Sequence, residues 1–186
     1  MKRVIIDMDH VMADFTDQYL SWYKEKTGVE VNREKLIGLT SESLAFPDPK
    51  LARSLLFVPG FFRTMKVMEG SQAVVKELNE VYDVQIVSSA MEFPQSLIEK
   101  YEWLQEHFPF ISWQQIAFTG NKKIIKGDYM IDDHFKNLDY FEGERLLFTA
   151  SHNLLSDKYT RVNNWEEVRA LLLPETVKKQ VVDSEQ

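Results

Sequence analysis

The chain has 186 residues, with 29 acidic and 22 basic side chains and a formal net charge of −7. Binding to a nucleic-acid polymer depends largely on Lys and Arg that neutralise phosphates, so this charge argues against such a partner but leaves room for a small phosphorylated substrate. The sequence has no cysteine, which excludes a disulfide framework, a thiolate metal site and a cysteine nucleophile. No apolar run approaches the roughly 20 residues of a membrane helix, and the first residues do not resemble a signal peptide. We therefore expect a cytoplasmic protein without a membrane partner.

Short apolar runs predict strands, and apolar side chains at helical spacing predict helices. Strands that alternate with helices are typical of an open, mostly parallel Rossmann-like α/β sheet flanked by helices, which is the predicted fold class. In chain order, the predicted elements are a strand over 4–6, a helix over 13–27, short helices from 32 and over 50–57, a helix over 71–81, a strand over 84–87, a helix over 94–107, strands over 116–118, 129–131 and 146–148, and a helix over 165–173.

The alternation is interrupted once, directly after the first strand. We expect residues 1–14 and 67–175 to form the catalytic core, and residues 15–66 to form a small helical cap inserted after that strand. Within the insertion, the turn Pro59-Gly60-Phe61-Phe62 carries two aromatic side chains that we expect to be exposed. Residues 176–186 are expected to form a loose tail.

Polar side chains follow several of the predicted strands, at the point where each strand ends. In open α/β sheets the carboxyl ends of the strands form the edge where ligands bind. Acidic groups that converge there repel one another unless a cation lies between them, and oxygen ligands favour Mg²⁺, which often bridges to a substrate phosphate. The candidate residues are Asp7 and Asp9 after 4–6, Ser88 and Ser89 after 84–87, Lys122 beyond 116–118, and Asp132 and Asp133 after 129–131.

Each of these groups also has an ordinary explanation, because an Asp or Ser after a strand often caps a turn or a helix, and a loop lysine is often solvated. Their conjunction favours a phosphate site. A signalling receiver domain gathers similar groups, but it places its acidic pair first and its phosphoacceptor after a middle strand, and it lacks an insertion of this size. A catalytically silent nucleotide-binding protein would have little reason to keep all four elements.

The sequence resembles the haloacid dehalogenase superfamily of phosphotransferases. The matching motifs are Asp7-Met8-Asp9 followed by Val11, Ser88 after its strand, Lys122, and Ile131-Asp132-Asp133 after Gly127-Asp128. More narrowly, it is similar to the 5'(3')-deoxyribonucleotidases. This second resemblance depends on Asp7-Met8-Asp9-His10-Val11-Met12-Ala13-Asp14-Phe15, Pro59-Gly60-Phe61-Phe62, Glu99-Lys100-Tyr101-Glu102-Trp103 and Phe148-Thr149-Ala150-Ser151-His152-Asn153.

The resemblance implies a Mg²⁺-dependent phosphomonoesterase that hydrolyses deoxynucleoside monophosphates. The alternative is a phosphatase of the same mechanism that acts on another small phosphate ester. Asp7 would attack phosphorus and form an aspartyl-phosphate, and Asp9 would serve first as general acid and then as general base. The implied metal ligands are Asp7, the main-chain carbonyl of Asp9 and Asp132, with Asp133 close behind. The implied phosphate ligands are Ser88, Ser89 and Lys122.

The resemblance also implies a base pocket lined by Phe15 and Phe62, although aromatic residues at such positions are often core residues. His10 replaces a residue that is commonly glycine in the superfamily. It either contacts substrate or the cap, or is a hinge histidine whose ring is satisfied by the backbone. Glu92 and Gly120 stand where some relatives carry basic residues, and Leu56 falls near a pocket tryptophan of the family. His134 is a candidate neighbour of the metal ligands, His107 and His152 have no evident catalytic geometry, and the insertion leaves room for a homodimer.

Overall fold

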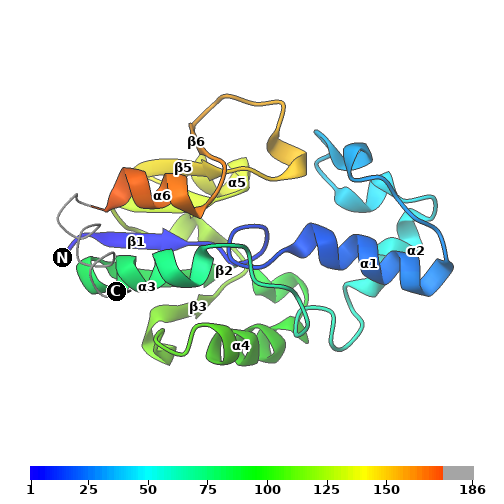
Figure 1. Cartoon of the computed structure of the whole chain (residues 1–186), viewed down its shortest axis with the longest axis horizontal. Helices are drawn as coiled ribbons and strands as arrows, with labels where there is room; N and C mark the ends of the chain where they lie inside the picture. Colours follow the sequence, from blue (N-terminus) through cyan, green and yellow to red (C-terminus); the bar gives the residue numbers. More distant parts are fainter. Residues whose placement is uncertain (174–186) are drawn as a thin grey trace, which may run out of the picture.

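The computed structural model describes residues 1–173, and all elements named below lie in that range. Six strands form one sheet in the order β3-β2-β1-β4-β5-β6, and the pairings between neighbours are parallel (Figure 1). This confirms the predicted α/β fold class. The strands are β1 (Arg3–Ile6), β2 (Asp83–Ser88), β3 (Ile116–Phe118), β4 (Tyr129–Asp132), β5 (Glu144–Phe148) and β6 (Thr160–Val162).

The sixth strand, β6, is absent from the elements predicted from the sequence. Its three residues, Thr-Arg-Val, pair with β5 at the edge of the sheet, and only Val162 is buried. A short edge strand with two polar residues has no apolar run, so periodicity could not find it.

Helices cover both faces of the sheet, which explains why β1 is apolar without alternation. Ile5, Met130 and Leu147 pack on one face, together with Leu138 of the short helix α5. Ile6 and its neighbours pack on the other face, under α3, α4 and α6. The bounds of these helices are α3 (Ser71–Val81), α4 (Ser96–His107), α5 (Phe135–Leu138) and α6 (Trp165–Leu172).

The inserted residues lie beyond the carboxyl end of β1 (Figure 1). They contain two α-helices and two 3-10 turns: α1 (Phe15–Thr27), η1 (Arg33–Leu36), η2 (Glu42–Ala45) and α2 (Pro49–Leu55). The chain enters and leaves this part along two hydrogen-bonded segments. The N–H of Asp14 donates to the carbonyl of Lys66 at 2.9 Å, and that of Met68 donates to Met12 at 2.8 Å. Entry and return are therefore fixed side by side.

The expectation that Phe61 and Phe62 are exposed is wrong, because both side chains are fully buried. The turn that carries them is folded inward by Glu99 of α4. The Glu99 carboxylate accepts hydrogen bonds from the backbone N–H groups of Gly60 at 2.7 Å, Phe62 at 3.0 Å and Arg63 at 3.2 Å. A Pro-Gly turn is usually a surface feature, but here a buried carboxylate satisfies its donors.

Within residues 1–173 no helix combines the length and the apolar composition needed to cross a lipid bilayer. The tail predicted over residues 176–186 lies outside the described part of the chain.

Candidate active site

Asp7 lies next to Asp132 because β1 and β4 are neighbours in the sheet. The N–H of Asp7 donates to the carbonyl of Ile131 at 2.9 Å, which continues the pairing of the two strands by one residue. Lys122 lies between the two carboxylates, with its Nζ 2.5 Å from Asp7 Oδ1 and 2.7 Å from Asp132 Oδ2. Asn137 donates to both Asp132 oxygens at 3.0 Å and holds that carboxylate in place.

Burial dominates the electrostatics of this group. It raises the pKa of Asp7 to about 8; the nearby carboxylates of Asp132 and Asp133 act in the same direction, and Lys122 opposes them. Burial alone would lower the pKa of Lys122, but the Asp132 and Asp7 carboxylates outweigh it and raise that pKa above its ordinary value. A further cation beside Asp7 would favour its ionised form, which is the form a nucleophile needs.

Asp9 is paired with a second buried lysine. Lys100 of α4 is 2% exposed, and its Nζ lies 2.5 Å from Asp9 Oδ2 and 3.0 Å from Ser88 Oγ. The same Nζ lies 4.8 Å from the centre of the Phe62 ring. Asp9 Oδ1 is buried, and the described residues offer it no hydrogen-bond partner.

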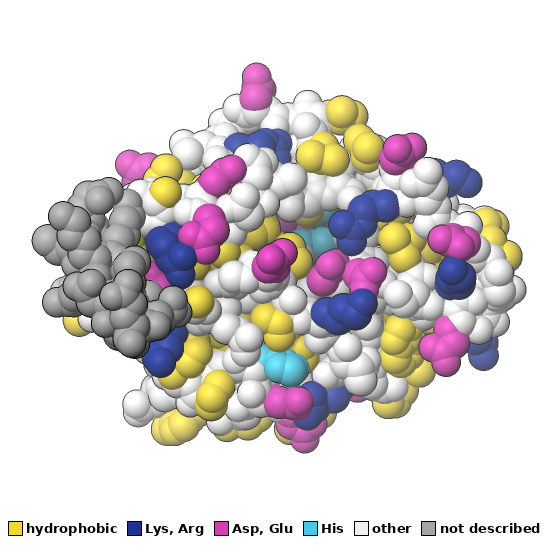
Figure 2. Space-filling model, in the orientation of Figure 1, with side chains coloured by type: hydrophobic (Ala, Val, Ile, Leu, Met, Phe, Trp, Pro, Cys, Tyr) yellow, Lys and Arg dark blue, Asp and Glu magenta, His cyan; other side chains and the backbone are white. Residues whose placement is uncertain are grey.

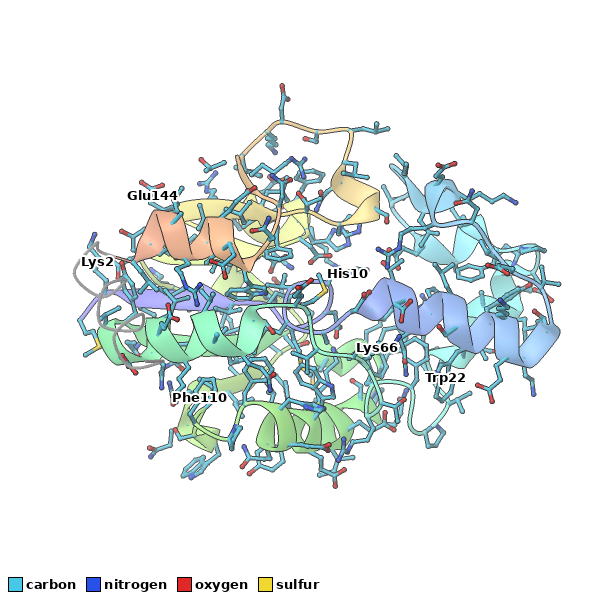
Figure 3. The ribbon with its side chains drawn as sticks, in the orientation of Figure 1. Lys2, His10, Trp22, Lys66, Phe110 and Glu144 are labelled. Atoms are coloured by element: carbon cyan, nitrogen blue, oxygen red, sulfur yellow. The ribbon has the colours of Figure 1, made fainter. Side chains whose placement is uncertain are left out.

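His10 occupies the loop between β1 and α1 (Figure 3) and has a left-handed backbone with φ of 62°. Glycine adopts this conformation without the Cβ strain that a histidine pays, so the position favours glycine. The ring is held by carboxylates rather than by the backbone: Nε2 lies 3.1 Å from Glu42 Oε1, and Nδ1 lies 3.0 Å from Asp133 Oδ2. The alternative of a hinge histidine satisfied by the backbone is therefore wrong.

These neighbouring charged groups shift one another's pKa values. Burial alone would lower the pKa of His10, but Glu42 and Asp133 outweigh it and raise the pKa well above its usual value. Burial alone would raise the pKa of Asp133, whereas the contact with His10 and the nearby His152 and His134 rings hold it well below its usual value. An ionised Asp133 next to a protonated His10 follows.

A cavity between the sheet edge and the inserted residues brings most of the predicted site together. In Figure 2 basic and acidic side chains gather at the middle of the face where these two parts meet, around a depression in which a histidine is visible. The residues that line the cavity include the predicted Asp7, Asp9, His10, Phe15, Phe62, Ser88, Ser89 and Asp133. Lys122 and Asp132 are not among the lining residues, but Lys122 contacts Asp7, which lines the cavity, and Asp132 contacts Lys122.

Sequence reasoning missed Lys100 as a site residue and Glu99 as a turn ligand. Leu97, Tyr101 and Leu104 lie at helical spacing in this segment, but the structure buries Glu99 and Lys100 together with Leu104 and leaves Leu97 and Tyr101 partly exposed. The available signal was the Glu99-Lys100 pair within a segment typical of the family. The periodicity of apolar side chains predicts that charged residues face the solvent, so it did not indicate that Glu99 and Lys100 are buried.

Glu42 was also missed, because it comes from the irregular part of the insertion, where no pattern indicates which side chain turns inward. Glu92 stands where some relatives carry a basic residue. It forms an ion pair with Arg53 of α2 at 2.8 Å. Both side chains are about half exposed and both line the cavity. The insertion thus places the Arg53 cation next to Glu92 in the lining of the cavity.

The donor set at the sheet edge fits a hard divalent cation. Asp7, Asp132 and Asp133 each offer a carboxylate oxygen, and these oxygens lie within 4.8 Å of one another. Carboxylate oxygens are the ligands that Mg²⁺ prefers, usually with bound waters and substrate phosphate completing its shell.

The chain matches known proteins over nearly its whole length. A Staphylococcus epidermidis protein is 42% identical over 168 residues, covering 90% of this chain and 94% of that protein. The 5'(3')-deoxyribonucleotidase of Bacillus subtilis is 40% identical over 174 residues, which cover 93% of this chain and 100% of that protein. A solved Bacillus subtilis structure, described as a HAD-hydrolase bound to magnesium, has a TM-score of 0.62 at 13% identity and covers 93% of this chain and 99% of that one.

A family model places these likenesses in one group. The model described as "5' nucleotidase, deoxy (Pyrimidine), cytosolic type C protein" matches residues 1–180. The structural neighbour shows the fold alone, whereas the family model and the curated relatives cover the candidate site as well. The chain therefore belongs to the family of 5'(3')-deoxyribonucleotidases within the haloacid dehalogenase-like fold.

Proposed function

We propose that this chain is a Mg²⁺-dependent 5'(3')-deoxyribonucleotidase that hydrolyses deoxynucleoside monophosphates. As a family member it is a phosphoric monoester hydrolase. The observation that carries the proposal is the pair of carboxylates on one loop, Asp7 and Asp9, each in contact with its own buried lysine. A phosphate ester held between two such lysines would meet a nucleophile and a proton donor together.

In this proposal Asp7 attacks phosphorus. One carboxylate oxygen forms the new P–O bond, the bond from phosphorus to the nucleoside oxygen breaks, and an aspartyl-phosphate results. Lys122, 2.5 Å from Asp7, offsets the negative charge of the nucleophile. Water then attacks the phosphorus and returns Asp7 as a carboxylate, with inorganic phosphate as the second product.

Asp9 supplies the proton chemistry. In its protonated form it gives its proton to the departing nucleoside oxygen, and it then takes a proton from the attacking water. Asp9 Oδ1 has no hydrogen-bond partner among residues 1–173, which leaves that oxygen free for such a transfer. Lys100 holds the other oxygen and fixes the orientation of the carboxyl group.

Asp7, Asp132 and Asp133, with the main-chain carbonyl of Asp9, would hold Mg²⁺. When bound, the ion would reduce the repulsion between an anionic nucleophile and an anionic substrate. We assign the phosphoryl oxygens to donors at the same edge of the sheet. These donors are Ser88, Ser89, Lys122 and Lys100.

Residues 15–66 would act as the specificity cap over a core of residues 1–14 and 67–175. Phe15 and Phe62 line the cavity with ring centres 6.2 Å apart, and the His10 ring lies 4.9 Å from Phe15. These rings would pack against the nucleoside. We further propose a cytoplasmic location. A homodimer stays a prediction, which light scattering after gel filtration tests.

A phosphate-release panel tests the proposal. Deoxynucleotides, ribonucleotides and sugar phosphates are compared with and without Mg²⁺, for the wild type, Asp7→Asn and the control Asp83→Asn. Asp83 lies at the amino end of β2, away from the carboxyl ends of the strands, and pairs with Arg3. We expect Mg²⁺-dependent release from deoxynucleotides by the wild type and the control, and none by Asp7→Asn. Near-normal turnover by Asp7→Asn would refute the mechanism, and activity on sugar phosphates alone would favour the alternative substrate class.

A further inference from the structure

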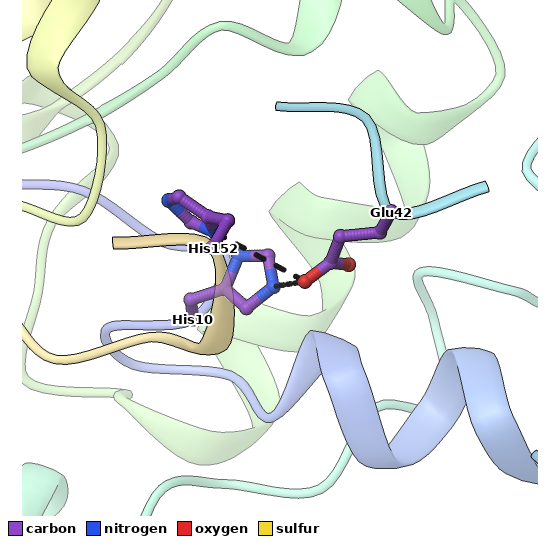
Figure 4. A group of neighbouring side chains, drawn as sticks. All are labelled: His10, Glu42 and His152. Carbon is purple, nitrogen blue, oxygen red and sulfur yellow. Dashed lines mark hydrogen bonds and ion pairs between the residues drawn. The ribbon is translucent and has the colours of Figure 1, made fainter. Parts of the chain in front are cut away.

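A second group of possible metal ligands lies beside the carboxylate site, and none of its members takes part in the proposed bond-making, bond-breaking or proton-transfer steps. His10 from the loop after β1, Glu42 from η2 and His152 from η6 (Ser151–Asn153) meet where the insertion contacts the core (Figure 4). Glu42 Oε1 lies 3.1 Å from His10 Nε2 and 4.0 Å from His152 Nδ1, and one ligand atom from each residue falls within 4.8 Å of the others. Side-chain exposures are 13% for His10, 10% for Glu42 and 6% for His152.

The two imidazoles are oriented in the same way. Each directs one ring nitrogen to Asp133 and the other to Glu42. His10 Nδ1 lies 3.0 Å from Asp133 Oδ2, and His152 Nε2 lies 3.0 Å from the Asp133 carbonyl oxygen. Histidines that bind metals commonly use their second nitrogen in this manner, with a carboxylate or a carbonyl that fixes the ring and the tautomer.

Glu42 gives an independent indication of a ligand. Its Oε2 is buried, and no described residue supplies a hydrogen bond to it. A buried carboxylate oxygen without a partner costs free energy, so such an oxygen is expected where a ligand completes the group. The glutamate comes from the insertion while both histidines belong to the core loops, so a shared ligand would join the two parts.

We propose that His10, Glu42 and His152 form a second metal site, separate from the Mg²⁺ site, for a divalent transition cation such as Zn²⁺. Two imidazole nitrogens and one carboxylate oxygen are a typical Zn²⁺ ligand set, whereas Mg²⁺ prefers oxygen alone. Tetrahedral bonds of about 2.1 Å put neighbouring ligands about 3.4 Å apart, which lies between the 3.1 Å and 4.0 Å that separate Glu42 Oε1 from the two imidazole nitrogens. All three residues line the cavity, so a fourth position would be open to water or to a substrate oxygen.

Without a transition cation the close contact in this group is the pair between His10 and Glu42 at 3.1 Å, while His152 lies 4.0 Å from the same oxygen. The two states differ in a measurable way, because a metal would bring His152 into direct ligation. The proposal therefore requires that His152 contributes to metal affinity, and a simple ion pair does not.

The experiment is a titration with Co²⁺, a spectroscopic substitute for Zn²⁺, in the presence of excess Mg²⁺ to occupy the oxygen site. The visible d–d absorption reports tetrahedral coordination, and equilibrium dialysis with metal analysis reports stoichiometry for Co²⁺ and Zn²⁺. We expect one tightly bound equivalent in the wild type. Glu42→Gln and His152→Gln should each weaken binding by about tenfold or more. His107→Gln is the matched control, since His107 lies outside the group beside Glu106.

Asp7→Asn separates the two sites. This variant is expected to lose phosphatase activity and to keep the Co²⁺ spectrum, so a failure of the proposed function and a failure of this inference are distinguishable. Circular dichroism checks that each variant folds. Wild-type protein that binds no Co²⁺ beyond the Glu42→Gln level, or binding abolished by Asp7→Asn and retained in His152→Gln, would overturn the second site.

Discussion

Replacement of Glu99 by Gln tests the idea that one buried carboxylate folds the aromatic turn into the protein. The glutamate is 8% exposed and accepts three backbone hydrogen bonds, at 2.7, 3.0 and 3.2 Å. A hydrogen bond to a charged group contributes about 1.5–3 kcal/mol, and neighbouring bonds of this kind are not additive. Glutamine keeps one acceptor oxygen but turns an NH₂ group toward N–H donors. We expect the free energy of unfolding to fall by roughly 2–4 kcal/mol.

Urea unfolding followed by circular dichroism measures this change. The matched control is Glu102→Gln on the same helix, because Glu102 is 55% exposed and its carboxylate pairs with the Arg63 guanidinium at 3.4 Å. An exposed pair of this kind contributes less than about 1 kcal/mol. The Glu99 variant should also raise KM, since Phe62 lines the cavity. A Glu99→Gln protein within about 1 kcal/mol of the wild type would refute the reasoning.

Further outcomes are expected at other positions. Tyr19→Phe removes a buried hydroxyl that lacks a partner among residues 1–173, so urea unfolding should show unchanged or slightly higher stability; a loss above about 1 kcal/mol would contradict this. Gly143→Ala would place a Cβ 2.5 Å from the Asp128 carbonyl oxygen and should cost about 2 kcal/mol or more, whereas Gly120→Ala, with its nearest atom at 3.7 Å, should change stability by less than about 0.5 kcal/mol. Lys100→Met should lower kcat about 100-fold in the phosphate-release assay; an unchanged kcat would remove Lys100 from the mechanism.

Much of the catalytic edge could be predicted because strand ends are easy to locate and parallel strands end at the same edge. Asp7 and Asp132 follow apolar runs in the sequence, and the register of β1 against β4 then brings them together. The same argument placed Ser88 near the site. The local sequence pattern and the topology of the sheet agree at these positions, so the sequence was sufficient to predict that these side chains lie at the same edge.

The remaining residues could not be predicted, because their positions depend on tertiary contacts between segments without periodicity. Glu42 lies in an irregular stretch, and its direction is set by His10. Lys100 lies on a helix whose buried face combines apolar and charged side chains. A buried charge is recognisable only with its partner, and the partners of these residues are far away in the sequence.

The strand order also dictates when an active enzyme can exist during synthesis. β1 is made first, yet Ile5 pairs with Gln85 on one side and with Met130 on the other. Until both partners leave the ribosome, β1 offers an apolar edge without backbone partners, which favours aggregation and holding by chaperones. The proposed nucleophile, Asp7, is thus among the first residues translated. Truncated chains that end before Asp132 should nevertheless be inactive and prone to association. Nascent chains of increasing length should gain protease resistance only beyond that point.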